Sequence, residues 1–141
     1  MPARRDNDDD GFSLIELLVV MIVIGILASI AIPVFLNQRA KAHDTSTKAD
    51  VTNLGKEVAT YHVDCKGTPV LDFDSKPGYV RIVEGAYSAE VRLTNGTAEP
   101  VTGSDASLGD AQAWCVSLTD LKGRDQQFRY TAASGLSTGG C

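Results

Sequence analysis

The sequence predicts an α+β fold in which one long N-terminal α-helix packs, by its second half, on a small antiparallel β-sheet. Three observations lead to this fold class. A long apolar run begins close to the N-terminus, a helical pattern with one apolar side follows it, and short alternating segments bounded by turn residues make up the rest. A chain of 141 residues allows one modest domain with an appendage.

The apolar run covers residues 12–36 and contains one charged residue, Glu16. As a helix it would measure about 37 Å, which is enough to span the hydrocarbon core of a membrane. A secretory signal would begin with a basic region and end in a small-residue cleavage site, and this run does neither clearly. A carboxylate in a lipid-facing helix costs about 2.5–3.5 kcal/mol, so Glu16 indicates more than a plain anchor.

The helix is predicted to continue to about residue 63 with one side facing a core. Val51, Leu54, Val58 and Tyr61 recur at helical spacing and form an apolar stripe. The residues predicted to face outward are Lys41, Lys48, Asp50, Lys56, Glu57 and the two histidines, His43 and His62. Residues 12–63 are therefore predicted to be one helix, apolar on all sides over 12–36 and amphipathic over 37–63.

Residues 64–141 are predicted to form the globular β-sheet head, together with the amphipathic helix. The predicted strands are Tyr79–Glu84, Ser88–Thr94, Ala113–Thr119 and Gln127–Ala132. Turns are expected at Gly85-Ala86 and at Asn95-Gly96, a strong hairpin signal. The residues expected to be buried against the helix are Val80, Ile82, Val91, Leu93, Trp114, Val116 and Phe128.

Composition argues against several classes of function. The formal net charge of -5 and the lack of a basic cluster speak against a stable nucleic-acid partner. Neither a nucleophile elbow nor a phosphate-binding loop occurs, so the chain is predicted not to be an enzyme and to need no cofactor. No metal site is predicted, because Cys and His lack ligand spacing. Weaker alternatives are calcium at Asp72–Ser75 and a glycan on Asn95.

The start of the apolar run carries a resemblance to a known family. Gly11-Phe12-Ser13-Leu14-Ile15-Glu16-Leu17-Leu18-Val19-Val20 resembles the cleavage and methylation signature of type IV prepilins and type II secretion pseudopilins. The resemblance implies a pilin-like fold, a leader of residues 1–11 removed by a prepilin peptidase between Gly11 and Phe12, and N-methylation of Phe12. Leaders of this family are commonly basic, whereas here Arg4 and Arg5 are outnumbered by acidic residues.

The resemblance also implies roles for residues within the helix. Glu16 would pair with the N-terminal amine of a neighbouring subunit and so set the axial stagger, because opposite charges attract strongly in a low-dielectric interior. Gly25 and Pro33 mark a stretch that bends or melts on assembly, since both residues weaken a helix. A slightly bent helix without melting is the alternative.

The three cysteines, Cys65, Cys115 and Cys141, allow at most one disulfide within the chain. A segment exported across a membrane meets oxidising conditions, which favour such a bond. Similarity to the C-terminal disulfide loop of many pilins favours Cys115–Cys141, which would also fix the Gly/Ser-rich tail. The alternative pairing is Cys65–Cys115.

The predicted function is that of a structural subunit, a pilin, of a type IV pilus-like filament assembled by bundling of the N-terminal helices. The alternatives are a type II secretion pseudopilin and a membrane-anchored binding domain. The expected partners are other copies of the chain, the prepilin peptidase, the assembly platform, minor pilins and, for the precursor, the membrane. The precursor is expected in the cell membrane as a single-pass protein, and the assembled filament outside the cell.

Overall fold

The structure is a computed structural model that describes residues 11–73, 78–94 and 108–141. The leader residues before Gly11, the predicted Asn95-Gly96 turn with its sequon, and the Asp74-Ser75 part of the weak calcium alternative lie outside these ranges. The chain divides after Asn37 into two units. The helix α1 (Leu14–Asp64) contributes residues to both.

The helix α1 agrees closely with the helix predicted over 12–63. In the unit from Gln38 to Cys141, its predicted stripe is fully buried at Val51, Leu54, Val58 and Tyr61. The prediction that Asp50 faces outward is wrong, because its side chain is only 3% exposed. Its carboxylate accepts hydrogen bonds from the backbone N–H and the hydroxyl of Thr94, at 2.7–3.0 Å, and this satisfies the buried charge.

The first sheet is antiparallel, in the order β1-β2-β3. It consists of β1 (Val70–Asp72), β2 (Tyr79–Glu84) and β3 (Tyr87–Arg92). Strand β2 has its predicted bounds, and the predicted turn at Gly85-Ala86 joins it to β3, with Gly85 at φ 57°. Strand β3 ends two residues earlier than predicted, because the N–H of Thr94 turns to Asp50 instead of continuing the ladder.

The second sheet is also antiparallel, in the order β4-β5-β6. It consists of β4 (Cys115–Thr119), β5 (Gln127–Thr131) and β6 (Gly135–Thr138). The predicted fold class is confirmed, and the described strands divide between two three-stranded sheets. Strands β1 and β6 were not predicted, because β1 has only three residues and β6 is rich in Gly, Ser and Thr.

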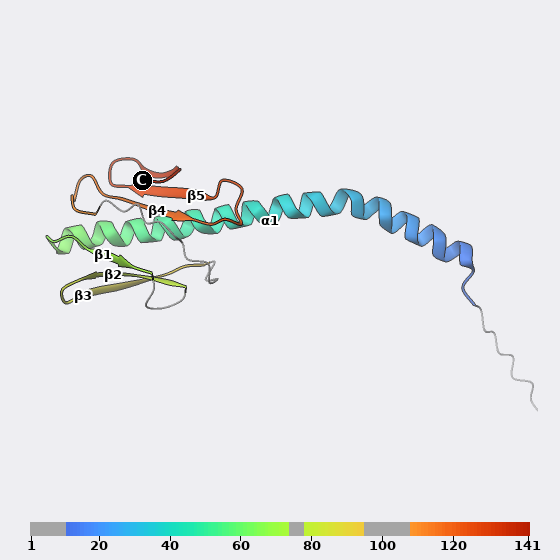
Figure 1. The fold of residues 1–141 in the computed structure, drawn as a ribbon, viewed down its shortest axis with the longest axis horizontal. Coiled ribbons are helices and arrows are strands. Elements are labelled where there is room, and N and C mark those ends of the chain that lie inside the picture. Colours follow the sequence, from blue (N-terminus) through green and yellow to red (C-terminus); the bar gives the residue numbers. More distant parts are fainter. Residues whose placement is uncertain (1–10, 74–77, 95–107) are drawn as a thin grey trace, which may run out of the picture. The chain divides into compact units, whose positions relative to one another are not determined.

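Both sheets pack on the amphipathic half of α1 (Figure 1). Every predicted core residue of the head is buried except Leu93, which is partly buried at the edge of the core, and Leu108 and Leu118 join the core without having been predicted. Gly55 of α1 lies so close to Tyr130 of β5 that an added Cβ would meet the ring at 2.5 Å. This close approach requires a glycine at the helix–sheet contact.

The prediction that both histidines are solvated is wrong. His43 Nδ1 lies 3.0 Å from Asp120 Oδ2 and is partly buried. His62 is half-buried, and its ring stacks at 6.5 Å on that of Trp114. The helical pattern places both residues beside the apolar stripe, where loops and aromatic side chains of the head reach them.

The last turns of α1 are tied to the first sheet through tyrosines. The Tyr61 hydroxyl donates a hydrogen bond to Glu84 at the end of β2, and the Tyr87 hydroxyl donates one to Glu57 at 3.4 Å. Burial and the neighbouring Glu84 carboxylate raise the pKa of Tyr61 to about 12. Both effects disfavour the charged phenolate and so favour the neutral tyrosine in the folded protein.

We expect the stability of the head to fall as the pH rises through the titration of Tyr61. A tyrosine in the unfolded chain titrates near pH 10. The stabilisation by neutral Tyr61 is therefore fully present below about pH 10 and is lost by about pH 12, because only the unfolded chain releases the proton in this window. Tyrosinate absorbance together with denaturant unfolding measures this, and Tyr61→Phe should flatten that part of the profile. An unchanged profile would contradict the assignment.

Candidate functional site

The helix begins at a capping box formed by Ser13 and Glu16. Residues 11–13 are not helical, and the backbone N–H groups of Glu16 and Leu17 donate to the carbonyl of Ser13 at 3.1 and 3.3 Å. The Ser13 hydroxyl accepts from the N–H of Ile15 at 3.3 Å, and Glu16 Oε2 accepts from the N–H of Ser13 at 2.9 Å. These bonds satisfy donors that a helix otherwise leaves unpaired. Helix α1 consequently starts just after the predicted cleavage point, Gly11-Phe12.

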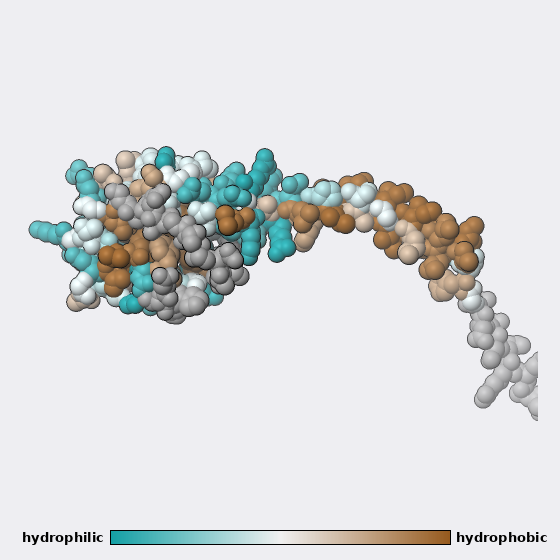
Figure 2. Space-filling model, in the orientation of Figure 1, coloured by the Kyte–Doolittle hydropathy of each residue, from teal (hydrophilic) through white to brown (hydrophobic). Residues whose placement is uncertain are grey.

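The first half of α1 exposes its apolar side chains on all sides. The large apolar residues from Phe12 to Leu36 are between 49% and 92% exposed in the isolated chain. Figure 2 shows these hydrophobic residues uncovered along the visible face of the helix. An 18-residue window in α1 has a mean hydropathy of 3.0 and is not buried at all. Among the described residues, α1 alone is long and apolar enough to cross a membrane.

Such a surface is not stable in water and needs an apolar environment. Burying apolar area stabilises by about 25 cal/mol per Å², so either lipid or other apolar helices would cover this segment. A helix suits both environments, because it satisfies its backbone hydrogen bonds internally. A helical segment of this kind is therefore compatible with either a bilayer or a bundle of helices.

Glu16 is the one charged side chain in this apolar segment. In the isolated chain it is exposed, and its carboxylate makes the capping contact with the N–H of Ser13. That contact leaves most of the acceptor capacity of the carboxylate available. In an apolar environment Glu16 would attract a positive group strongly, and an amine created at Phe12 would be such a group.

Gly25 and Pro33 both lie inside α1, which the structure keeps helical across them. Nothing lies within 4 Å of the position of a Cβ on Gly25. Ser29, between them, donates its hydroxyl hydrogen to the carbonyl of Ile26 at 2.7 Å. Bending or melting of this stretch on assembly therefore remains a prediction.

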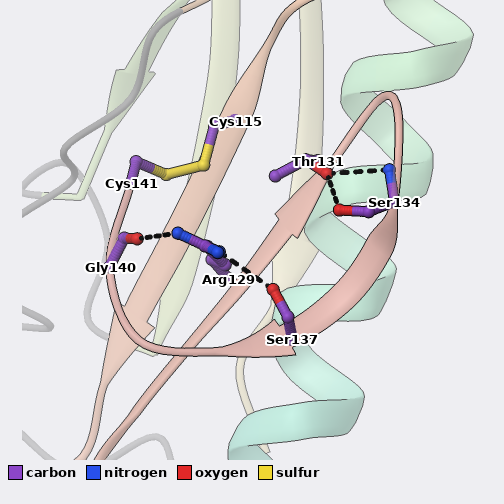
Figure 3. The surroundings of a disulfide bond; sticks show 7 residues. All are labelled: Cys115, Arg129, Thr131, Ser134, Ser137, Gly140 and Cys141. Atoms are coloured by element: carbon purple, nitrogen blue, oxygen red, sulfur yellow. Dashed lines mark hydrogen bonds between the residues drawn. A yellow bond between two sulfur atoms is a disulfide. The ribbon is translucent and has the colours of Figure 1, made fainter.

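The C-terminal tail is closed by the disulfide between Cys115 and Cys141, the pair that the pilin resemblance favours (Figure 3). Arg129 also holds the tail, because its Nε donates to Ser137 Oγ and its Nη1 to the carbonyl of Gly140, both at 2.9 Å. The tail is thus held to β5 by strand β6 and by Arg129, and to β4 by the covalent bond to Cys115. Sequence analysis did not identify Arg129 in this role.

The remaining candidate residues form no chemical site in the described part of the chain. Cys65 is a partly buried free thiol. Within residues 11–73, 78–94 and 108–141, no three His, Cys, Asp or Glu side chains are grouped to hold a metal ion. Asp72, which belongs to the weak calcium alternative, is paired with Arg81 in the β1–β2 ladder, and its Oδ2 lies 3.8 Å from Arg81 Nη1.

Ser13 is a site residue that sequence analysis missed. The signal for it is present in the sequence, because a serine three residues before a glutamate, at the start of an apolar run, is the pattern of a capping box. Capping and a contact between subunits are compatible roles for Glu16, since capping uses one of the two carboxylate oxygens.

Comparison with known proteins places this N-terminal segment in context. The model of the prokaryotic N-terminal methylation motif matches residues 6–32. The competence protein ComGC of Halalkalibacterium halodurans is 32% identical over 87 residues, covering 61% of this chain and 85% of its own. The type IV major pilin PilA of Myxococcus xanthus is 28% identical over 134 residues, covering 95% of this chain and 57% of its own.

A third relative comes from a secretion system. The type II secretion system core protein G of Escherichia coli is 31% identical over 61 residues, covering 43% of this chain and 42% of its own. The chain therefore spans little more than half of the Myxococcus pilin and less than half of the secretion protein. No solved structure matches the chain significantly.

The fold and the site define a class of protein, one that joins an uncovered apolar N-terminal helix to a small α+β head. The motif match and the competence relative, most of whose length this chain covers, make the assignment specific. The chain belongs to the type IV pilin-like family that carries the prokaryotic N-terminal methylation motif.

Loss of the disulfide should destabilise the head. In a Cys65→Ser background, which prevents mispairing, Cys141→Ser should lower the free energy of unfolding by about 3–4 kcal/mol, because the bond closes a loop with a sequence separation of 26. Denaturant unfolding in detergent measures this against Cys65→Ser alone, which should itself cost about 1 kcal/mol or less. Equal stability of the two proteins would mean that β6 and Arg129 hold the tail without the bond.

Proposed function

We propose that the chain is the precursor of a structural subunit, a pilin, of a type IV pilus-like filament. The observation that carries this proposal is the uncovered apolar half of α1, which carries a single charged residue, Glu16, in its first turn. A chain that needed only an anchor could cap its helix without placing a carboxylate in the membrane, where a carboxylate is costly. A subunit that repacks the same helix against copies of itself has a use for both features.

The first step of the proposed function is removal of the leader, residues 1–11. A prepilin peptidase cuts between Gly11 and Phe12 and methylates the new amine of Phe12. Both residues are outside the helix, and Phe12 is 92% exposed, so the peptide bond between them is accessible in an extended backbone. A glycine before the cut removes side-chain hindrance in the peptidase cleft.

The second step is assembly of the mature subunits. Residues 12–36 leave the membrane and form the filament core, residues 37–63 join the core to the head, and residues 64–141 complete the head on the filament surface. The Glu16 carboxylate meets the Phe12 amine of a neighbouring subunit. A wrong axial stagger leaves both charges unpaired in an apolar core, and that penalty selects the register.

The proposed partners follow from this pathway. They are other copies of the chain, the prepilin peptidase, an assembly platform that extracts subunits from the membrane, and minor pilins. The precursor is a single-pass protein of the cell membrane, and the filament lies outside the cell. The relatives are named as a pilin, a competence protein and a secretion-system core protein, which supports a structural rather than an enzymatic role.

The second candidate function is that of a type II secretion pseudopilin, which would use the same N-terminal chemistry. The extent of similarity favours the pilin. The match to the Myxococcus pilin runs over 95% of this chain, whereas the match to the secretion core protein covers 43%. The tail closed by Cys115–Cys141 also agrees with the pilin resemblance.

Mass spectrometry of the native protein tests the proposal directly. We expect a mature N-terminus at methylated Phe12, because the motif places the cut after Gly11. A variant with Gly11→Val should keep the leader, since a branched side chain would obstruct the peptidase cleft. An intact Met1 in the wild-type protein, or a cut near Ala31, would instead make the helix a tether or a secretory signal.

Replacing the charge of Glu16 should separate processing from assembly. Glu16→Gln keeps an acceptor for the capping box, so we expect normal insertion and cleavage. Filaments should be lost, because an unpaired buried amine costs about 3–5 kcal/mol per subunit contact. Filament yield by electron microscopy measures this, with Glu90→Gln on strand β3 as the matched control. Normal filaments from Glu16→Gln would refute the register role.

A further inference from the structure

One exposed apolar side chain of the head lies in a distinctive setting. Among the described residues from Gln38 to Cys141, the exposed large apolar side chains are Val63, Val70, Leu121 and Leu136. Of these, Leu121 alone stands in a cationic loop, Leu121-Lys122-Gly123-Arg124, in which both basic side chains are exposed. A leucine at 68% exposure beside two cations combines an apolar contact with an electrostatic one.

The loop that carries Leu121 is held firmly in place. It joins β4 to β5 over residues 120–126, and the N–H of Asp120 donates to the carbonyl of Gln126 at 2.7 Å. Two further bonds, from Gly123 N–H to Asp120 O and from Lys122 N–H to Asp120 Oδ1, shape the tip. Leu121 is therefore presented outward by an ordered loop.

Two contacts fix this loop to α1. His43 Nδ1 lies 3.0 Å from Asp120 Oδ2, and both oxygens of the Asp44 carboxylate accept from the N–H of Asp125 at 3.2 Å. Gly123 lies so close to Asp44 that an added Cβ would clash with its Oδ1. In Figure 1 the loop after β4 lies against α1.

The attachment point lies early in the head-bearing part of the helix. His43 follows Leu36, the last residue of the apolar run, by seven positions in the same helix. Seven residues correspond to about 10 Å of helix, and the headgroup layer adds roughly 5–8 Å on each side of the hydrocarbon core. Only this short stretch of chain separates the end of the apolar run from the residue that contacts the loop, so a membrane-spanning run keeps the attachment point of the loop near the headgroups along the chain.

The charges around the loop fit a surface of negative headgroups. Arg39 and Lys41 are exposed on α1 within four positions of His43, the residue that contacts the loop. The nearby carboxylates of Asp44 and Asp120 face inward, to the N–H of Asp125 and to His43. Asp125 is the exposed acidic residue of this loop. Cations thus predominate here, although the whole chain has a net charge of -5.

We propose that Arg39, Lys41, Leu121, Lys122 and Arg124 form a basal surface that docks on anionic phospholipid headgroups while the subunit is in the membrane. The proposal rests on the proposed function, because it requires residues 12–36 to span the bilayer. Leu121 enters the headgroup layer and the four cations contact lipid phosphates. This contact holds the head against the membrane before assembly, and extraction into a filament breaks it.

Site-specific fluorescence quenching tests the basal surface in the full chain. Single cysteines are introduced at Leu121, Val63 or Ile24 in a Cys65→Ser background with the Cys115–Cys141 disulfide intact, and each is labelled with an environment-sensitive fluorophore. Each protein is placed, one chain per disc, in nanodiscs of phosphatidylcholine and phosphatidylglycerol. The discs carry nitroxide quenchers on either headgroups or acyl chains. Val63 is the matched control, because it is apolar, 84% exposed and about 30 Å farther along the helix than His43.

We expect the label at position 24 to be quenched from the acyl chains, the label at 121 from the headgroups, and the label at 63 from neither. Quenching at 24 with none at 121 would overturn the basal surface and leave the proposed function standing. No quenching at 24 would overturn membrane insertion, and with it both proposals.

The charge contribution is tested separately. Lys122→Gln and Arg124→Gln should each weaken the headgroup contact about fivefold, because a basic residue near an anionic membrane contributes about 1 kcal/mol. Added salt or discs of pure phosphatidylcholine should have the same effect on quenching at position 121. Quenching that is unchanged by both variants and by lipid charge would overturn the anionic-headgroup assignment.

Discussion

The packing of two separate sheets on one helical stripe is the interaction on which the rest of the head depends. The described strands form two three-stranded sheets that share no ladder, and small sheets of this kind need a partner surface to be stable. The side chains of Val51, Leu54, Val58 and Tyr61 provide that surface and are fully buried. Because one helix completes both halves of the core, a disruption of this stripe would loosen both sheets together.

The same helix meets a different constraint in its first half. There the apolar residues lie on all sides of the helix, and the rest of the chain leaves their side chains largely exposed. The stability of this segment therefore depends on surroundings outside the chain. Both lipid and a bundle of similar helices can cover these apolar side chains, but the two environments differ in how they accommodate the Glu16 carboxylate. A carboxylate is tolerated in lipid near the helix end, but it is stabilised in a bundle that supplies an opposite charge. The N-terminal capping box with Ser13 lets Glu16 serve the helix start in either state.

Hydrogen bonds of polar side chains fix the positions of loops that packing of the core alone would not hold. Asp50 binds Thr94 and so fixes the chain after β3. The β4–β5 loop is fixed by Asp44 and His43, and the C-terminal tail is fixed by Arg129. Each of these contacts gives a buried or half-buried polar group a partner, which avoids the cost of burying it unpaired. The placement of the β4–β5 loop therefore follows from its contacts with His43 and Asp44 rather than from strand propensity.

The sequence alone determined the helix, its division near residue 36, the core stripe and four of the six strands in the described part of the chain, because these features follow from local hydrophobic patterns. The motif from Gly11 to Glu16 is likewise local, so the family is recognisable from those few residues. Tertiary structure alone decided that the strands form two sheets, that Asp50 and His43 turn inward, and that β6 forms from a Gly-rich tail. Asp50 and His43 depend on partners 44 and 77 residues away in the chain, and β6 forms only by pairing with β5; no local pattern of hydrophobicity encodes such partners.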